Sequence, residues 1–272
     1  MPARDAGLAA DRSLIEDAVR AAGAIARKFY GGDYKKWDKG KGQPVTEADL
    51  AVDQYLRETL TAARPGYGWL SEETEDDPSR LERRKVFVVD PIDGTIAFLK
   101  NRPHFTICVA VVCDGRPVVG AVHNPVLDEC FAATIGEGAS LNGTAIHVSA
   151  RAELEGCRML SDRAMLAHPA WNNPPNRPWP PMHIETRNSV AYRMALVASG
   201  AFDATIALSA KRDWDMAAAD LIVREAGGAM TTHTGDVPRY NGEHAIQPSL
   251  IAAGPALHAE ILSRVGHINL QR

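Results

Sequence analysis

The 272-residue sequence is poor in cysteine and contains only Cys108, Cys113, Cys130 and Cys157. None of them forms a Cys-x-x-Cys pair, so their spacing matches neither a zinc ribbon nor a thioredoxin-type redox site. We therefore predict buried free thiols in place of disulfides. The nine histidines are scattered and lack the His-Glu-x-x-His spacing of a zinc hydrolase.

A long apolar run is also missing. Nowhere do about 18 apolar residues follow one another, and the first ten residues hold charges where a signal peptide has an apolar stretch. The formal net charge of −4 does not favour binding to a nucleic-acid backbone or to an anionic membrane. We expect a cytoplasmic protein with neither partner. A phosphorylated substrate remains compatible, because a bound cation reverses the local field.

Two common catalytic motifs are incomplete. The segment Gly138-Ala139-Ser140-Leu141-Asn142 comes closest to a serine nucleophile elbow but lacks the final glycine. Gly136-Glu137-Gly138 is the only candidate for a dinucleotide-binding loop, and no third glycine follows at the required place. The sequence thus excludes a serine hydrolase of this type and a dinucleotide-dependent oxidoreductase.

The composition is that of a globular protein, with 45% hydrophobic and 24% charged residues. The length permits one large domain or two smaller ones. Because no internal repeat and no long linker is found, we predict a single unit over residues 1–272. Its first half, residues 1–150, is expected to be α+β, and its second half, residues 151–272, to alternate strands and helices as an α/β half.

Helical periodicity dominates the first part of the chain. Apolar residues from Leu14 to Phe29 recur at helical spacing, and Gly31-Gly32 ends the predicted helix. A second helix is predicted to begin near Thr46, which would cap it, and to end before Pro65. The lysine-rich residues 35–42 between them are expected to form a loop.

Short apolar runs then predict strands. Residues 86–89 should form a buried strand that ends directly in Asp90. Asp114-Gly115 separates two further runs and predicts a hairpin, and Asn142-Gly143 marks another tight turn. Further elements are expected as a strand at 130–134, helices at 189–200 and 214–226, and a strand at 202–208. The proline-rich residues 169–181 predict a rigid surface loop, with a substrate cover or a subunit contact as the alternative.

Two carboxylates follow the strand at 86–89. Pro91 fixes one backbone angle and Gly94 frees another, so the chain can turn and aim Asp90 and Asp93 into one crevice. Like charges that close need a cation, and oxygen ligands of this kind suit Mg²⁺. Gly94 and Thr95 would open a short helix whose free N–H groups bind an anion. The alternative is an ordinary surface turn.

Three other acidic segments can join this site, although each has an ordinary interpretation. Glu72 begins an acidic run that solvent alone could explain. Asp49 follows a helix cap, and Asp215 stands in the first turn of a helix, where a carboxylate compensates the helix dipole. Their joint occurrence favours a metal centre for phosphoryl transfer.

Together these segments resemble the inositol monophosphatase family of magnesium-dependent, lithium-sensitive phosphatases. The resemblance extends from the first helix to about Ala253, with the motifs in the family's order and approximate spacing. The matching motifs are Pro44-Val45-Thr46-Glu47-Ala48-Asp49, Ser71-Glu72-Glu73, Val89-Asp90-Pro91-Ile92-Asp93-Gly94-Thr95, and Trp214-Asp215-Met216-Ala217-Ala218 running to Glu225-Ala226-Gly227-Gly228.

The resemblance implies a five-layer αβαβα sandwich, a homodimer, and two or three Mg²⁺ ions per site. Glu72, Asp90 and the carbonyl of Ile92 would hold the first ion. Asp90 would bridge to a second ion that Asp93 and Asp215 complete, and Glu72 would share a third.

The resemblance also implies the catalytic groups. Asp49 and Thr95 match the pair that positions and deprotonates the attacking water, with Glu72 as a further catalytic residue, and the amides of Gly94 and Thr95 would bind the phosphate. A divalent cation lowers the pKa of bound water, so no covalent enzyme intermediate is needed. The expected substrate contacts are Asp93, Ser189, Lys211 and Arg212.

Two branches of the family compete for the substrate assignment. In the inositol branch a glutamate usually precedes the Trp-Asp motif, whereas residues 204–213 contain none, and Lys211 and Arg212 could meet a second phosphate. The motif Leu70-Ser71-Glu72-Glu73 also favours the 3'(2'),5'-bisphosphate nucleotidases. Against this branch, Ile92 replaces their more frequent leucine, and Ile96-Ala97 replaces their usual Lys-Glu.

We therefore favour a nucleotidase that converts adenosine 3',5'-bisphosphate to AMP and phosphate. Inositol-1-monophosphatase and histidinol-phosphate phosphatase are the alternatives. A catalytically inactive regulatory member of the family would lack one of the proposed ligands, whereas all of them are present.

Overall fold

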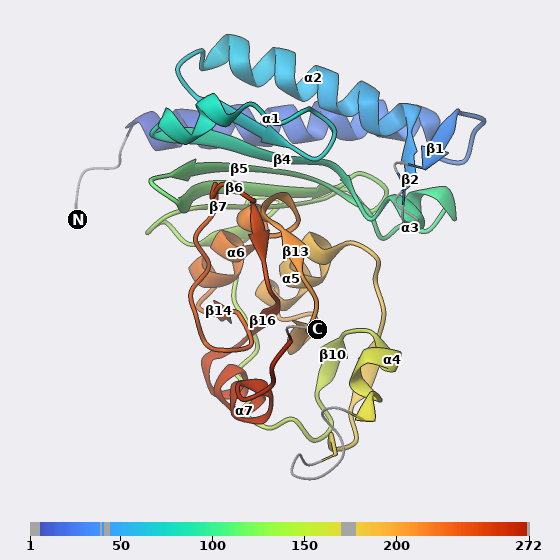
Figure 1. The fold of residues 1–272 in the computed structure, drawn as a ribbon, viewed down its shortest axis with the longest axis vertical. Coiled ribbons are helices and arrows are strands. Elements are labelled where there is room, and N and C mark those ends of the chain that lie inside the picture. The colour runs from blue at the N-terminus through green and yellow to red at the C-terminus, as the bar shows by residue number, and fades with distance from the viewer. Residues whose placement is uncertain (1–5, 39, 41–43, 170–177, 271–272) are drawn as a thin grey trace.

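The computed structural model describes residues 6–38, 40, 44–169 and 178–270, and its helices and sheets stack in five layers (Figure 1). Helices α1 (Ala6–Phe29) and α2 (Glu47–Ala63) form one outer layer, and α7 (Pro255–Val265) lies at the other end of the stack. Two sheets lie between these layers and enclose α5 (Val190–Ala198) and α6 (Asp213–Glu225). This order confirms the expected αβαβα sandwich.

The first sheet has seven strands in the order β3-β4-β5-β6-β7-β8-β9. Strands β3 and β4 are parallel, and every later neighbour pairs antiparallel. The predicted hairpin is confirmed, because Asp114 and Gly115 take the positive φ values of 50° and 80° that a type I′ turn requires. The strands are β3 (Gly68–Ser71), β4 (Lys85–Asp93), β5 (Thr106–Cys113), β6 (Arg116–Asn124), β7 (Glu129–Thr134), β8 (Ala139–Leu141) and β9 (Thr144–Ile146).

Both faces of this sheet are covered. Val86 and Val88 of β4 belong to the core cluster shared with α5 and α6, whereas Phe87 and Val89 belong to the cluster beneath α1 and α2. A strand buried on both faces carries apolar residues without alternation. This explains the continuous apolar runs in the sequence.

The second sheet has five strands in the order β11-β10-β12-β16-β14. Strand β10 pairs parallel with β11 and β12, and β16 pairs antiparallel with β12 and β14. The strands are β10 (Arg158–Leu160), β11 (His183–Glu185), β12 (Ala204–Ala207), β14 (Ala229–Thr231) and β16 (Leu250–Ala253), and α4 (Arg163–Leu166) follows β10.

Several expectations need correction. The loop expected at residues 35–42 contains β1 (Lys36–Asp38), which pairs with β2 (Pro44–Thr46). Strand β4 does not end in Asp90 but continues to Asp93, with a shift of register between the two, because it keeps pairing with β5. Lys211 and Arg212, for which no strand was predicted, form β13 (Lys211–Arg212), which pairs with β15 (Ile246–Gln247). Most of the proline-rich stretch, residues 170–177, lies outside the described residues.

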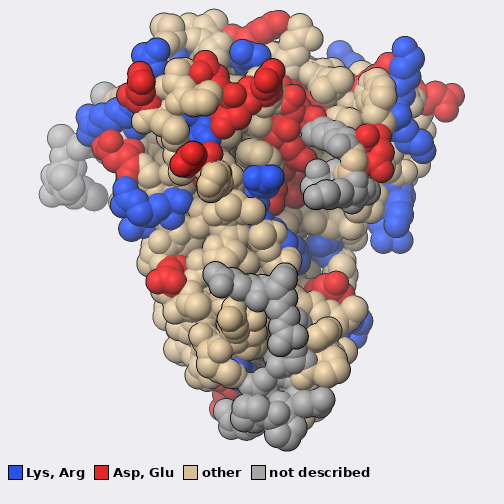
Figure 2. All heavy atoms as spheres, viewed as in Figure 1, with Lys and Arg blue, Asp and Glu red and all other residues tan. Residues whose placement is uncertain are grey.

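The four cysteines are free thiols, as predicted; three are buried, and Cys113 is partly exposed. Among the described residues, no helix is both long and apolar enough to cross a membrane. Acidic side chains gather over the upper part of the face shown in Figure 2, where the first sheet and its helices lie, and most of the lower part is uncharged.

Candidate active site

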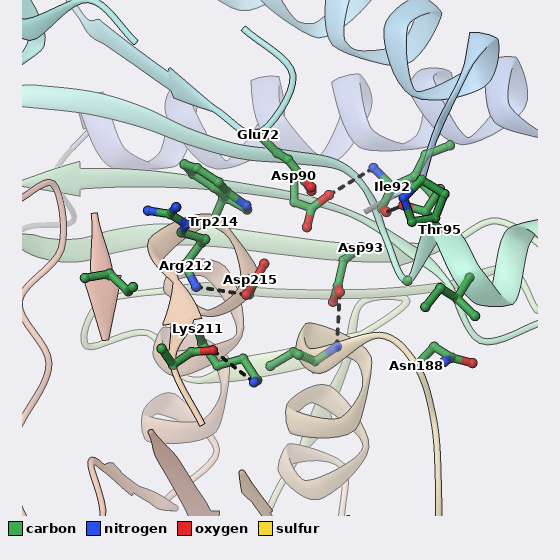
Figure 3. A pocket seen from close by; sticks show the side chains of 16 residues that line it. Glu72, Asp90, Ile92, Asp93, Thr95, Asn188, Lys211, Arg212, Trp214 and Asp215 are labelled. Atoms are coloured by element: carbon green, nitrogen blue, oxygen red, sulfur yellow. Dashed lines mark hydrogen bonds between the residues drawn. The ribbon is translucent and has the colours of Figure 1, made fainter. Parts of the chain in front are cut away.

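A cavity of about 540 Å³ opens where the end of β4 meets the first residues of α6 and the start of α5. Glu72, Asp90, Asp93 and Asp215 line it together with Lys211 (Figure 3). The structure thus gathers four acidic residues from three separate segments of the chain.

Strand pairing places the first two carboxylates. Because β3 and β4 are parallel and Ser71 lies opposite Val89, the next residues, Glu72 and Asp90, emerge side by side at the same edge of the sheet. The N–H of Glu72 donates to the carbonyl of Val89 at 3.3 Å, which holds this register beyond the strand end.

Asp90 is almost completely buried, with 1% of its surface exposed. Its Oδ1 accepts a 3.0 Å hydrogen bond from the N–H of Ile92. Burial raises the pKa of Asp90 well above its usual range, and the charges of Glu72, Asp93 and further carboxylates raise it further. A cation bound here would restore the charged form.

Asp93 is held by the first turn of α5. Its carboxylate accepts hydrogen bonds from the hydroxyl of Ser189 (2.6 Å) and from the N–H groups of Val190 (3.1 Å) and Ala191 (2.6 Å). Burial still raises the pKa of Asp93, against these hydrogen bonds and the charge of Arg193. A carboxylate has about four acceptor positions, so these bonds leave room for a cation.

Ser189 was predicted to contact substrate. In the structure it is completely buried and lies just behind the residues of the cavity lining, between Asn188 and Val190. Its hydroxyl donates to Asp93 and accepts from the N–H of Tyr192 at 2.9 Å as the cap of α5. Ser189 therefore positions Asp93.

The sequence allowed Asp215 either to compensate the dipole of its helix or to join the other carboxylates, and its position in the structure is compatible with both roles. Its Oδ2 accepts a 2.9 Å hydrogen bond from the N–H of Arg212 at the start of α6, and the residue also lines the cavity. Burial raises the pKa of Asp215 to about 7, with a further contribution from Asp93. Two of the cavity's carboxylates thus repel each other when no cation is bound.

Asp49 likewise caps its helix and reaches toward the cavity. Its Oδ2 accepts from the N–H (2.8 Å) and the hydroxyl (2.5 Å) of Thr46, as predicted for the cap. Its Oδ1 lies 3.4 Å from the hydroxyl of Thr95, and that hydroxyl lies 3.2 Å from the carbonyl of Ile92. The sequence pair Asp49 and Thr95 is therefore brought together.

Gly94 caps α3 (Thr95–Leu99) with φ of 96° and ψ of 38°, a left-handed conformation that favours glycine. Gly94 and Thr95 both line the cavity. Since the first N–H groups of a helix have no carbonyl partner within that helix, this end can receive an anion.

Lys211 and Arg212 line the cavity from the opposite half of the chain. The ammonium of Lys211 donates to Ser209 Oγ at 2.7 Å, and burial, followed by the charge of Arg193, lowers its pKa. The Arg212 guanidinium lies 5.6 Å from the ring centroid of Trp214 and donates to the carbonyl of His244 at 3.1 Å.

The donors around the cavity are oxygens. Within the described part of the chain, no three Asp, Glu, His or Cys side chains converge closely enough to enclose a metal ion by themselves. Mg²⁺ does not require such a cage, because it keeps several waters and uses one or two carboxylates together with substrate phosphate oxygens. The carboxylates of Glu72, Asp90, Asp93 and Asp215, with the carbonyl of Ile92, therefore fit Mg²⁺.

Sequence reasoning did not identify every residue here. Asn188 and Trp214 line the cavity, and Arg193 lies beside it in α5. Arg193 had a usable signal, because it is a lone charge in an otherwise apolar helix. No local pattern distinguished Asn188.

The pattern of the inositol monophosphatase family matches residues 10–269, nearly the whole chain. The chain belongs to the inositol monophosphatase family. It is accordingly a phosphoric monoester hydrolase, of a family that generally depends on a metal, commonly Mg²⁺.

Relatives of this inositol monophosphatase family member have several names. A Nus factor SuhB from Pasteurella multocida is 32% identical over 91% of the chain and 92% of the relative. An inositol-1-monophosphatase from Caulobacter vibrioides is 32% identical over 93% and 99%, and a histidinol-phosphatase from Chlorobaculum parvum is 29% identical over 94% and 97%. The crystal structure of the extragenic suppressor protein suhB from Bartonella henselae superposes with a TM-score of 0.82 at 29% identity, covering 95% of this chain and 99% of that one. Two of these names specify a phosphate ester, and the two esters differ.

Proposed function

We propose that this phosphatase hydrolyses a small phosphate monoester that carries a second anionic group, with adenosine 3',5'-bisphosphate as substrate and AMP and phosphate as products. The observation that carries this proposal is the placement of Lys211 and Arg212 on the cavity wall contributed by the second half of the chain. Cationic side chains there can bind a phosphate that is not cleaved.

The proposed metal ligands are those predicted from the sequence. Glu72, Asp90 and the Ile92 carbonyl would hold one ion, Asp90, Asp93 and Asp215 a second, and Glu72 would share a third. Bound Mg²⁺ supplies charge stabilisation and lowers the pKa of the attacking water. The three hydrogen bonds leave one acceptor position of Asp93 open. Asp93 can therefore bind an ion while it keeps its hydrogen bonds to the first turn of α5.

The proposed catalytic pair is Asp49 and Thr95. With its hydroxyl proton directed at Asp49, 3.4 Å away, Thr95 can accept a hydrogen bond from the attacking water. Asp49 then takes up the hydroxyl proton of Thr95, and Thr95 receives a proton from the water in exchange. Glu72 is proposed to line the side of the cavity where this water binds. The N–H groups of Gly94 and Thr95 would bind the phosphate oxygens.

Further features of the cavity support a nucleotide. The segment from Ala204 to Lys211 offers no carboxylate to bind sugar hydroxyls. Ile96 and Ile246 line the cavity with 42% and 47% of their surfaces exposed, and Trp214 lines it as well. An aromatic base can stack on such a surface, whereas a polyol gains little there.

Other predictions from the sequence remain proposals. These are the division into halves at about residue 150, lithium sensitivity, a homodimer and a cytoplasmic location. Inositol 1-phosphate and histidinol phosphate are the alternative substrates, and the names of two relatives support them.

The test compares phosphate release from adenosine 3',5'-bisphosphate, inositol 1-phosphate and histidinol phosphate at matched concentration, with Mg²⁺ and with or without Li⁺. We expect the bisphosphate to have the highest kcat/KM and Li⁺ to inhibit its hydrolysis. The Asp49→Asn variant is the control for contaminating phosphatase. A clear preference for either of the other esters would overturn the substrate proposal.

A further inference from the structure

Arg193 is a buried cation whose Nε is unpaired within the described part of the chain. It lies in α5, where every other residue of the helix is apolar or aromatic, and only 8% of its surface is exposed. Its Nε has no hydrogen-bond partner, and its guanidinium forms no ion pair with any residue that the structure describes. Buried polar groups are normally paired, so this side chain requires an explanation.

The helix directs Arg193 toward the active site. Side chains on a helix lean toward its N-terminus, and the N-terminal turn of α5 is the one that binds Asp93 through Val190 and Ala191. The charges that act on Arg193 are those of Asp93, Asp215 and Asp162. The helix geometry and these charges together direct Arg193 toward the carboxylates of the cavity, although Arg193 is not itself among the residues that line it.

Lys211 is a second cation at this place. The charge of Arg193 acts on Lys211, which lines the cavity and itself forms no ion pair within the described residues. Lys211 lies where the parallel strand β12 ends, since it binds Ser209, and the charge of Asp162, which follows β10 closely, acts on Arg193. The carboxyl ends of parallel strands are a common position for ligands.

A cation buried in this way destabilises the fold. Burying a charge without hydrogen bonds costs free energy, and an apolar side chain of similar length would fit the apolar surroundings of α5 better. Sites that bind ligands commonly retain such a cost. Once Mg²⁺ balances the charges of Asp93 and Asp215, Arg193 and Lys211 are left as uncompensated positive charges.

We propose that Arg193, together with Lys211, binds the second anionic group of the substrate, the one that is not cleaved. This inference rests on the proposed function and names the residue that selects doubly anionic substrates. Arg193 supplies a planar set of donors suited to phosphate or carboxylate, and Lys211 supplies a point charge.

A purely internal role for Arg193 predicts something different. If it only compensated Asp93 and Asp215, its removal would change Mg²⁺ affinity and would affect every substrate to the same degree. A subsite for the second anion predicts a loss confined to ligands that carry this anion. The two roles are therefore separated by a matched pair of ligands.

Adenosine 3',5'-bisphosphate and adenosine 3'-monophosphate form this pair, because they differ only in the 5'-phosphate. Their dissociation constants are measured by calorimetry with Mg²⁺ in the Asp49→Asn background, which prevents turnover. We expect the bisphosphate to bind more tightly, and Arg193→Met to weaken its binding about 10- to 100-fold. Binding of the monophosphate should change less than threefold.

Arg193→Lys and Arg163→Met serve as comparisons. Lysine keeps the charge without the planar donors, so Arg193→Lys should lose bisphosphate affinity to a smaller extent, and it tests the proposal if the methionine variant does not fold. Arg163 is exposed on α4, and its removal should leave both dissociation constants unchanged. The melting temperature of Arg193→Met should equal or exceed that of the parent.

The inference and the proposed function fail in different ways. If the ratio of the two dissociation constants is the same in the parent and in the folded Arg193 variants, the subsite is overturned, whatever the preferred substrate. If the parent enzyme prefers inositol 1-phosphate in turnover but Arg193→Met still removes the preference for the bisphosphate ligand in binding, the subsite stands and the substrate proposal falls.

Discussion

The guanidinium of Arg80 donates a 2.7 Å hydrogen bond to Oδ1 of Asn241, a residue 161 positions further along the chain. The same group binds both carboxylate oxygens of Asp76, at 2.6 and 2.8 Å, and the carbonyl of Gly242 at 3.2 Å. Arg80 thereby joins the segment that follows Glu72 to a loop of the second half.

That loop in turn supports the start of α6. The N–H of Asn241 donates to Oδ2 of Asp213 at 2.7 Å, and Gln247 donates to the other oxygen at 2.8 Å. Asp213 is completely buried and lies two residues before Asp215. The contact between Arg80 and Asn241 is therefore linked to the position of a proposed metal ligand.

Arg80→Met should destabilise the protein and impair catalysis together. The change leaves Asn241 and a loop carbonyl without their donor, and we expect the free energy of unfolding to fall by about 2–4 kcal/mol. Urea unfolding and kcat/KM are measured in parallel with Arg83→Met, which removes an exposed arginine from the same segment. Equal values for the two variants would contradict the role of Arg80.

Asp90→Asn should abolish turnover. Asp90 is proposed to serve two metal positions, and a substitution that merely disturbs a ligand's support already costs 10- to 100-fold in metal affinity or activity, so we expect a loss of at least about 100-fold. Asp114→Asn is the matched control, since this exposed hairpin residue has a φ of 50° that asparagine tolerates. Substantial Mg²⁺-dependent phosphate release by the Asp90 variant would contradict the proposed metal site.

Mg²⁺ binding should release protons near neutral pH. In the metal-free protein the pKa of Asp215 is raised from 3.8 to about 7, so at pH 6 this carboxyl is mostly protonated and the cation must displace the proton. We expect Mg²⁺ affinity to increase from pH 6 to pH 8. The raised pKa also means that Asp215 disfavours folding of the metal-free chain increasingly between pH 3.8 and 7.

Calorimetry in two buffers of different ionisation enthalpy measures the number of protons released. The Asp215→Asn variant cannot release this proton, so its Mg²⁺ binding should be weaker and less dependent on pH. Identical proton release at pH 6 in the parent and in Asp215→Asn would assign the proton to another group.

The sequence predicted the elements whose patterns are local. The apolar run at residues 86–89 and the Asp114-Gly115 turn depend on neighbouring residues only, and both were confirmed. The five-layer arrangement came from the resemblance to a family. The carboxylates of the proposed metal site were grouped by the same resemblance, and the structure brings them to one cavity.

Other features depend on partners distant in the chain. Strands β1 and β13 are three and two residues long and exist because β2 and β15 offer backbone partners, so periodicity could not reveal them. The hydrogen bond of Ser189 to Asp93 arises only when α5 packs beside β4, so the sequence could not show it. The partners of Arg80 and the isolation of Arg193 are likewise tertiary properties.

His123 should make the protein sensitive to acid. Burial lowers its pKa from 6.5 to about 4, with a smaller contribution from Arg20, so the folded protein keeps this ring neutral. His123 costs no free energy of unfolding above pH 6.5. As the pH falls from 6.5 toward 4 the free energy of unfolding decreases, because the unfolded chain is protonated first. The loss is roughly 3 kcal/mol at the lower limit.

Urea unfolding at pH 7 and pH 4.5 measures this loss. His123→Gln removes the titrating group and should reduce the difference between the two pH values, whereas His183→Gln, at an exposed position of β11, should not. The absolute stability of His123→Gln at pH 7 is not decisive, since the ring packs closely on Gly23. An unchanged acid dependence in His123→Gln would refute the assignment.

Gly94→Ala should impair phosphate binding beyond the strain of its backbone. Gly94 and Gly136 both have positive φ, 96° and 76°, so alanine at either position costs about 1–2 kcal/mol of stability. The two glycines differ in the space available for a Cβ. A Cβ on Gly94 would lie 3.0 Å from the carbonyl of His104 and 3.0 Å from the N–H of Ser189, whereas a Cβ on Gly136 meets no atom within 4 Å.

The two variants therefore separate strain from displacement. Both should lose similar backbone stability, but only Gly94→Ala must shift the start of α3, where the amides of Gly94 and Thr95 are proposed to bind phosphate. We expect kcat/KM to fall at least about tenfold in Gly94→Ala, with weaker inhibition by inorganic phosphate, and to be unchanged in Gly136→Ala. The two variants share the backbone strain, and only Gly94→Ala displaces its surroundings. Equal activity in the two variants, after correction for the folded fraction, would therefore show that the position of this turn does not matter to the reaction.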